Sequence, residues 1–295
     1  MSFLFNRLGH LFLLLLAVLP YSWVVNIGYA IGRLGPIVAP KRDAIVKANL
    51  RACFPHFSQE KVMELANQHW RLFGRSLAER GRVWLGSAAS IQEFVEFKSD
   101  VDLADGQPRL FVGMHMVGIE AGLLAFTIRL QELKARPGIT LYVRMTNAYF
   151  EQKIKAWRER FGARMLLRQN QTRELIREIR KGTVVLISPD MDLGLNDSIF
   201  VPFFGFPTNT VTSLSRLARA SGAQVCPVVT TLKEGGSGYI CHVGQPWQNY
   251  PTDDIEADTL RMNQFFETQI RPRIAEYYWV HKRFKNRPEG QPSIY

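Results

Sequence analysis

Residues 109–120 read Arg-Leu-Phe-Val-Gly-Met-His-Met-Val-Gly-Ile-Glu, an apolar run that ends in a histidine before a helical pattern begins. Similar strand-like runs lie near 139–144, 183–188, 224–231 and 239–243, and helical patterns lie near 119–133, 150–161, 170–181, 212–221 and 254–277. This alternation predicts an α/β fold with a mixed, mostly parallel sheet flanked by helices. The glycine-rich turn at 233–238 joins the last two strands, so one antiparallel pair is expected near the end of the sheet.

The histidine at the end of the first strand is a candidate catalytic base. Glu120 follows His115 by five residues, and on one continuous helix that spacing rotates the side chains apart by about 500°. With His115 in the loop and Glu120 in the first helical turn, the two can meet. A carboxylate that fixes the tautomer of a histidine makes it a general base. The spacing is common by chance, so a loop histidine beside a solvated glutamate is the alternative.

A second apolar strand, 184–187, is followed by Ser-Pro-Asp-Met-Asp-Leu-Gly at 188–194. Two aspartates therefore stand at a strand end, which is where α/β sheets bind ligands. Because no His or Cys cluster accompanies them, no metal site is expected. Residues 200–207, Phe-Val-Pro-Phe-Phe-Gly-Phe-Pro, are too apolar for an ordinary loop, and indicate either a buried loop or a wall for an acyl chain.

The N-terminal region has the composition of a membrane anchor. Residues 8–32 contain no Lys, Arg, Asp or Glu, and a membrane span needs about 20 mostly apolar residues. Pro20 is expected to kink or end the first helix, so partial insertion and a buried core helix are alternatives. Basic residues follow the run, which places the bulk of the chain in the cytoplasm. We expect an anchor and interfacial helix over 1–35 and one catalytic domain over 36–295.

The charge balance indicates an acidic partner. The chain has 37 Lys and Arg against 26 Asp and Glu, a net charge of +11. Residues 129–181 alone hold fourteen basic and five acidic side chains, a surplus of +9. No nucleic-acid recognition motif is present, so an anionic membrane or an acidic carrier protein is the expected partner. The three cysteines have no C-x-x-C spacing, so neither a structural zinc site nor a redox dithiol is indicated. Nucleotide-binding and G-x-S-x-G motifs are missing, so neither a nucleotide cofactor nor a serine hydrolase is indicated.

These features together resemble the late acyltransferases of lipid A biosynthesis, which add lauroyl or myristoyl chains. The resemblance covers nearly the whole chain, and the order and spacing of its motifs carry it. The motifs are the N-terminal apolar run, Ala-Asn-Leu-Arg-Ala-Cys-Phe-Pro at 48–55, the H-x4-(D/E) pair His115 and Glu120, the segments 189–194 and 200–204, and Tyr-Trp-Val-His-Lys-Arg-Phe-Lys-Asn-Arg-Pro-Glu-Gly at 278–290.

The resemblance implies a glycerolipid-acyltransferase-like fold and an inner-membrane enzyme, single-pass or monotopic, that faces the cytoplasm. It would move a fatty acyl group from the phosphopantetheine thioester of acyl carrier protein, a co-substrate rather than a bound cofactor, to a hydroxyl of a 3-hydroxyacyl chain of a lipid A precursor. His115 would be the general base and Glu120 would orient it. Arg144 would bind substrate or the oxyanion, although its block, Tyr-Val-Arg-Met-Thr-Asn at 142–147, departs from the family's Y-R-x-x-x-N.

The remaining implied roles concern substrate binding. Asp190, Asp192 and Gly194 match a D-x-D-x-G motif and would be structural or substrate-positioning, and Phe203 would belong to the acyl wall. The implied partners are acyl carrier protein, the lipid A precursor and anionic inner-membrane lipids. His281, with the basic residues after it, would contact membrane or phosphate rather than act as a second base. The alternatives are an acyltransferase of the same fold for another glycolipid, an aminolipid or a glycerophospholipid, and a non-catalytic basic protein of the membrane surface.

Overall fold

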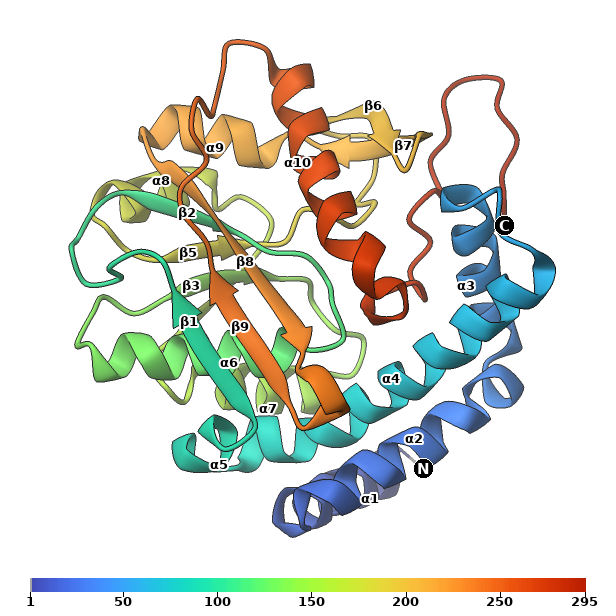
Figure 1. Ribbon diagram of the computed structural model, residues 1–295. Coiled ribbons are helices and arrows are strands. Elements are labelled where there is room, and N and C mark those ends of the chain that lie inside the picture. Colours follow the sequence, from blue (N-terminus) through green and yellow to red (C-terminus); the bar gives the residue numbers. More distant parts are fainter. Residues whose placement is uncertain (1) are drawn as a thin grey trace.

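The structure is a computed structural model that describes residues 2–295. The protein is built on a seven-stranded mixed sheet (Figure 1). The strand order is β1-β9-β8-β2-β5-β3-β4, and every neighbouring pair is parallel except β8 with β9. The strands are β1 (Val95–Ser99), β2 (Arg109–Val112), β3 (Ile139–Tyr142), β4 (Arg164–Leu167), β5 (Val185–Ile187), β8 (Gln224–Leu232) and β9 (Tyr239–Val243). The predicted mixed, mostly parallel sheet and its one antiparallel pair are confirmed.

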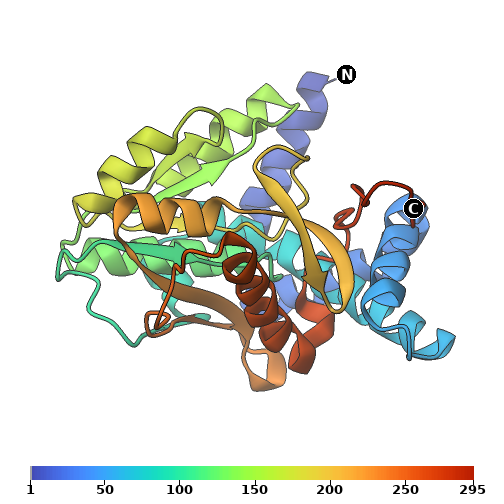
Figure 2. The same ribbon diagram turned by 90° about the horizontal axis from the view of Figure 1, so that it is seen from above.

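Helices cover both faces of this sheet (Figures 1 and 2). One face packs on α6 (Ile119–Glu132), α7 (Ala148–Glu159) and the end of α4 (Gln59–Leu85), and the short α5 (Ala88–Gln92) lies beside them. The other face packs on α8 (Thr172–Arg180), α9 (Ser213–Ser221) and α10 (Ile255–Ile270). The predicted helix over 254–277 is α10 followed by a 3₁₀ segment, Arg271–Glu276. Gly222, at φ 72°, ends α9 in the left-handed conformation that a C-terminal glycine supplies.

A two-stranded hairpin replaces the buried loop that the apolar segment 200–207 suggested. Strands β6 (Ser198–Phe203) and β7 (Phe206–Val211) pair antiparallel, with Phe203 opposite Phe206. Buried Val201 and Phe203 alternate with exposed Phe200 and Pro202, which is a strand period rather than a loop pattern. Phe204 and Gly205 both have positive φ, as a tight two-residue hairpin turn requires.

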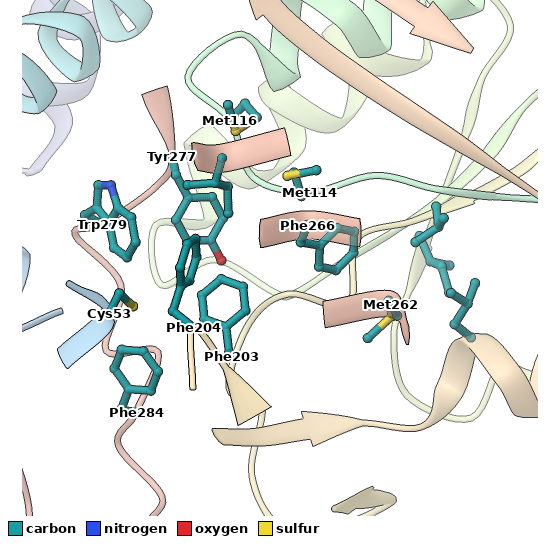
Figure 3. Packing of buried hydrophobic residues seen from close by; sticks show 14 of the residues in the cluster. Cys53, Met114, Met116, Phe203, Phe204, Met262, Phe266, Tyr277, Trp279 and Phe284 are labelled. Atoms are coloured by element: carbon teal, nitrogen blue, oxygen red, sulfur yellow. The ribbon is translucent and has the colours of Figure 1, made fainter. Parts of the chain in front are cut away.

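The hairpin is anchored in an aromatic core. Phe203 lies against Phe204, Tyr277 and Phe284, with ring centroids 4.9–6.4 Å apart (Figure 3). Figure 3 shows the same core continuing to Met262 and Phe266 of α10 and to Met114 and Met116 after β2. The hairpin therefore joins the C-terminal segment to the loop that carries His115.

The N-terminal helices pack on α4. Helices α1 (Ser2–Val18) and α2 (Tyr21–Val38) lie along it, and α3 (Pro40–Cys53) follows (Figure 1). A glycine stripe on α2 permits close approach, since a Cβ at Gly32 would stand 2.2 Å from the carbonyl oxygen of Trp70. Pro20 divides the apolar run between α1 and α2, in accord with its expected helix-ending effect. The predicted boundary at residue 35 falls inside α2.

A buried ion pair links these helices to the sheet. Arg75 and Glu79 of α4, 0% and 3% exposed, meet at 2.7 Å. The hydroxyl groups of Tyr21 in α2 and Tyr239 in β9 both donate to the Glu79 carboxylate, so the pair is hydrogen-bonded on several sides. Within residues 2–295, no helix is long and apolar enough to cross a membrane.

Candidate active site

His115 is held by Asp190, which lies 75 residues further along the chain. Strands β2 and β5 are parallel neighbours with Val112 opposite Ile187, and each site residue stands three positions beyond its strand. The Nδ1 atom of His115 lies 2.6 Å from Oδ1 of Asp190, and the backbone N–H of His115 donates to Oδ2 at 2.8 Å. The same carboxylate therefore fixes both the ring and the backbone of His115.

Burial and charge set the protonation of this pair. Burial alone would lower the pKa of His115, but the charge and hydrogen bond of Asp190, aided by Glu120, outweigh it and leave the pKa raised. Burial would raise the pKa of Asp190, which His115 holds below its usual value instead. Asp190 is 1% exposed, whereas 29% of the His115 side chain is exposed. A proton thus stays on Nδ1, and the open part of the ring is free to exchange protons with a ligand.

Glu120 has other partners than the predicted one. Its carboxylate accepts two hydrogen bonds from the Arg158 guanidinium and one from Nε1 of Trp84, at 3.0 Å for the Trp84 bond. Burial would raise the pKa of Glu120, but the Arg158 charge keeps it lowered, so the carboxylate remains ionised. The prediction that Glu120 orients the His115 ring is corrected here: Asp190 occupies that position, because β5 ends beside β2.

Arg158 connects the site to the N-terminal helices. It lies on α7, whose Trp157 stacks on Trp84 of α4 with ring centroids 5.7 Å apart. At the start of α7, the Tyr149 hydroxyl meets Nδ1 of His10 in α1 at 2.9 Å. The position of α7, and with it the Glu120–Arg158 pair, therefore depends on contacts from α1 and α4.

The C-terminal segment completes the wall around His115. The N–H of Tyr278 donates to the carbonyl of His115 at 2.9 Å, and the Tyr277 hydroxyl donates to the carbonyl of Asp190 at 3.3 Å. The rings of His115 and Tyr278 have centroids 6.1 Å apart. This contact brings His281, three residues further on, into the same cleft.

The cleft beside His115 has a volume of about 1130 Å³. Its apolar lining includes Met114, Ile119, Leu123, Phe126, Leu141, Met165, Leu175, Ile176 and Val228. Its polar and charged lining includes His115, Glu120, Arg80, Arg158, Arg168, Arg216, Tyr278 and His281. An apolar cavity with a few convergent polar groups is the usual form of a small-molecule site. Residues 2–295 hold no group of three or more His, Cys, Asp and Glu side chains placed to bind a metal ion.

Three of the predicted substrate residues lie in the scaffold. Asp192 is 2% exposed, and its carboxylate accepts hydrogen bonds from the N–H of Gly194 and from the side chains of Asn209 and Asn286. Gly194, at φ 106°, forms the turn after the strand. Phe203 is fully buried in the aromatic core. These contacts fasten the C-terminal segment to β7 and support the cleft from behind.

Arg144 projects away from the protein. Its side chain is 72% exposed and approaches Glu151 at 3.9 Å. Its neighbours Tyr142, Val143 and Met145 line the cleft, but Arg144 is not among the described residues that do. The cleft is lined instead by Arg158 and Arg80, whose positive charges act on Glu120 and which no motif singled out. Arg158 lies on α7 and Arg80 on α4, and the sequence of a helix does not distinguish an arginine that faces inward from one on the surface.

The chain is similar to known proteins over nearly its whole length. Residues 2–286 match the family described as Bacterial lipid A biosynthesis acyltransferase. The chain is 31% identical to the lipid A biosynthesis lauroyltransferase of Escherichia coli K12, over 95% of this chain and 91% of that protein. It is 30% identical to the palmitoleoyltransferase of the same strain, over 94% and 90%, and 23% identical to its myristoyltransferase, over 92% and 83%.

A solved structure is also similar, but distantly. The 1-acyl-sn-glycerophosphate acyltransferase of Thermotoga maritima superposes with a TM-score of 0.39 at 12% identity, covering 84% of this chain and 94% of that one. This TM-score is too low to assign a shared architecture, so the glycerolipid-acyltransferase-like fold remains a prediction. The family match and the relatives at 30–31% identity span nearly the whole chain, and the chain therefore belongs to the bacterial lipid A biosynthesis acyltransferases.

Proposed function

We propose that the protein transfers a fatty acyl chain from acyl carrier protein to the hydroxyl of a 3-hydroxyacyl chain on a lipid A precursor. The observation that carries this proposal is the His115–Asp190 pair, which stands in the wall of a large cleft lined mostly by apolar side chains. The apolar part has the chemistry for an acyl chain, and the histidine has the chemistry to activate a hydroxyl.

His115 would act first as the general base and then, once protonated, as the general acid. With the Nδ1 proton held by Asp190, Nε2 accepts the proton of the acceptor hydroxyl, and the oxygen attacks the thioester carbonyl. The new ester C–O bond forms, the C–S bond breaks, and the proton on Nε2 passes to the departing thiolate. Glu120 would contribute indirectly, since its carboxylate holds Arg158 at the cleft and favours the imidazolium that forms on His115.

The basic side chains favour acidic substrates. Arg168 and Arg216 line the cleft together with Arg80 and Arg158, and the region 129–181 carries most of the net positive charge. Such a surface attracts an acidic carrier protein and the phosphate groups of a glycolipid at long range. We therefore assign acyl carrier protein as donor and the phosphorylated lipid A precursor as acceptor.

We also propose that the protein acts at the inner membrane with its cleft on the cytoplasmic side. One stripe of α1 carries five exposed apolar side chains at helical spacing: Leu4, Leu8, Leu11, Leu15 and Val18. The same helix buries Leu16 against α4. Trp23, Leu34 and Ile37 extend the exposed apolar surface on α2. We propose that this exposed apolar surface inserts into the membrane interface.

The proposal is tested by acyl transfer in vitro. Purified protein is mixed with an acyl carrier protein thioester and a lipid A precursor that lacks its secondary acyl chains, and the product is followed by mass spectrometry. Transfer is expected for the wild type and a loss of at least about 10²-fold for His115→Ala, in line with removal of a general base. Acyl-CoA in place of the carrier thioester tests the donor.

The outcomes separate the alternatives. Full activity of His115→Ala would refute the catalytic assignment, and no transfer by any variant would favour a binding protein. Transfer to glycerophosphate or an aminolipid, without transfer to the lipid A precursor, would favour another acceptor. An unaltered acylation pattern of lipid A in cells that lack the protein would do the same.

A further inference from the structure

His281 is a second histidine of the cleft, and its ring is fixed in a particular tautomer. The backbone N–H of Asp192 donates to its Nε2 at 3.2 Å, so Nε2 must be the unprotonated nitrogen. The proton of the neutral ring is then on Nδ1. Within residues 2–295, Nδ1 has no hydrogen-bond partner, although the ring lines the cleft that also contains His115.

The surroundings keep this ring neutral. Burial, the positive charge of Arg283 and the nearby His115 lower the pKa of His281 to about 4, despite the opposing effect of Asp190 and Asp192. At physiological pH, Nδ1–H is therefore a hydrogen-bond donor that does not lose or gain a proton. Neutral imidazole can polarise a carbonyl oxygen in this way, because the donor is oriented before the reaction begins.

The backbone places His281 in the wall of the same cleft as His115. Tyr278 is hydrogen-bonded to the carbonyl of His115, and the chain then turns so that His281 follows three residues later. The carbonyl of His281 accepts from Nδ2 of Asn49 at 2.7 Å, and the carbonyl of Trp279 accepts from the same nitrogen, also at 2.7 Å. The ring is thus held from its backbone by α3 and from its Nε2 by the strand-end loop.

We propose that His281 is a catalytic hydrogen-bond donor, whose Nδ1–H binds the thioester carbonyl oxygen and stabilises the negative charge that develops there. This inference rests on the proposed acyl transfer and adds to it the group that stabilises the negative charge on the thioester oxygen. His115 takes the proton of the attacking hydroxyl and returns it to the thiolate, while His281 keeps its proton throughout. The developing charge lies on oxygen until the C–S bond breaks.

Two amides separate a catalytic donor from a structural acceptor. In His281→Asn the amide nitrogen can occupy the place of Nδ1, whereas in His281→Gln the amide oxygen can occupy the place of Nε2 and accept from Asp192. The Gln variant is expected to lose about 10²–10³-fold in kcat, the usual effect of removing one oxyanion donor, with little change in KM. The Asn variant is expected to retain kcat within about tenfold. Thermal unfolding of both variants accompanies the kinetics.

The reverse pattern would overturn the proposal. Near-native kcat in His281→Gln, with a loss in His281→Asn, would mean that the ring only accepts the Asp192 N–H. Equal losses in both variants, or wild-type kcat in both, would also refute a donor at the Nδ1 position. His115→Ala is measured alongside: if that variant retains activity, the proposed acyl-transfer chemistry fails whatever the His281 variants show.

Discussion

The substitution Asp190→Asn tests the central contact of the site with almost no change in shape. The backbone N–H of His115 donates to one carboxylate oxygen of Asp190, so the amide oxygen of Asn must take that place. The amide NH₂ then faces Nδ1, which can no longer donate and becomes an acceptor. The ring proton moves to Nε2, the nitrogen that must be unprotonated to accept the proton of the acceptor hydroxyl.

The expected loss follows from this tautomer change. The equivalent aspartate-to-asparagine change in a Ser-His-Asp triad lowers kcat by about 10⁴-fold, and a loss of that order is expected here. The pKa of His115 is raised in the native enzyme, so native kcat/KM should fall as pH drops through a value above 6.5. Without the Asp190 charge, burial dominates and lowers that pKa, and the acid limb of any residual activity should move to lower pH.

Asp192→Asn is the matched control. Asp192 is also buried and multiply hydrogen-bonded, but its carboxylate contacts Gly194, Asn209 and Asn286 rather than His115. We expect it to lower the thermal midpoint while kcat stays within about tenfold. Initial rates of acyl transfer against pH, with thermal unfolding of each variant, provide the comparison. The reasoning would be refuted by Asp190→Asn retaining more than a tenth of native kcat, or by both variants losing kcat equally.

Three further predictions concern the scaffold and the membrane. Gly32→Ala should destabilise the protein by about 1–3 kcal/mol because the added methyl would overlap an α4 carbonyl, and an unchanged denaturation midpoint would contradict the close packing of α2. Glu79→Gln breaks a buried ion pair and should reduce the free energy of unfolding by about 3–5 kcal/mol, whereas Glu64→Gln on the surface of α4 should leave it unchanged. Leu11→Asp with Leu15→Asp should reduce co-flotation with anionic vesicles while cleft activity on detergent-dispersed substrate persists; equal flotation of variant and wild type would argue against α1 as the interfacial helix.

The sheet architecture was predictable because its signals are local. Apolar runs of strand length, separated by helical periods, identify β2, β3, β5, β8 and β9 in the sequence. Strands β1 and β4, at the two edges of the sheet, were not predicted. Strand β1 alternates over only five residues, Val95–Ser99, and β4, Arg164–Leu167, shows no alternation. The β6–β7 hairpin was missed because a phenylalanine stands in its turn, where Gly or Asn is the usual signal.

The candidate base was also predictable, but its partner was not. His115 is visible because it stands at the end of an apolar strand, and Glu120 stands nearest to it in sequence. Asp190 becomes the partner only because β5 lies next to β2 and both residues follow their strands by three positions. Strand order is decided by packing and helix connections across the whole domain, and no short segment of the chain encodes it.

The amino-acid sequence thus determined the class of fold, the apolar N-terminal helices, the basic surface and the position of the candidate base. Each of these depends on composition or on residues close together in the chain. Only the tertiary structure decided that Asp190 holds His115, that Glu120 pairs with Arg158, and that His281 enters the cleft with Nε2 bound to the backbone of Asp192. These are contacts between segments separated by 38 to 89 residues, and their geometry depends on how the sheet and the C-terminal segment pack together.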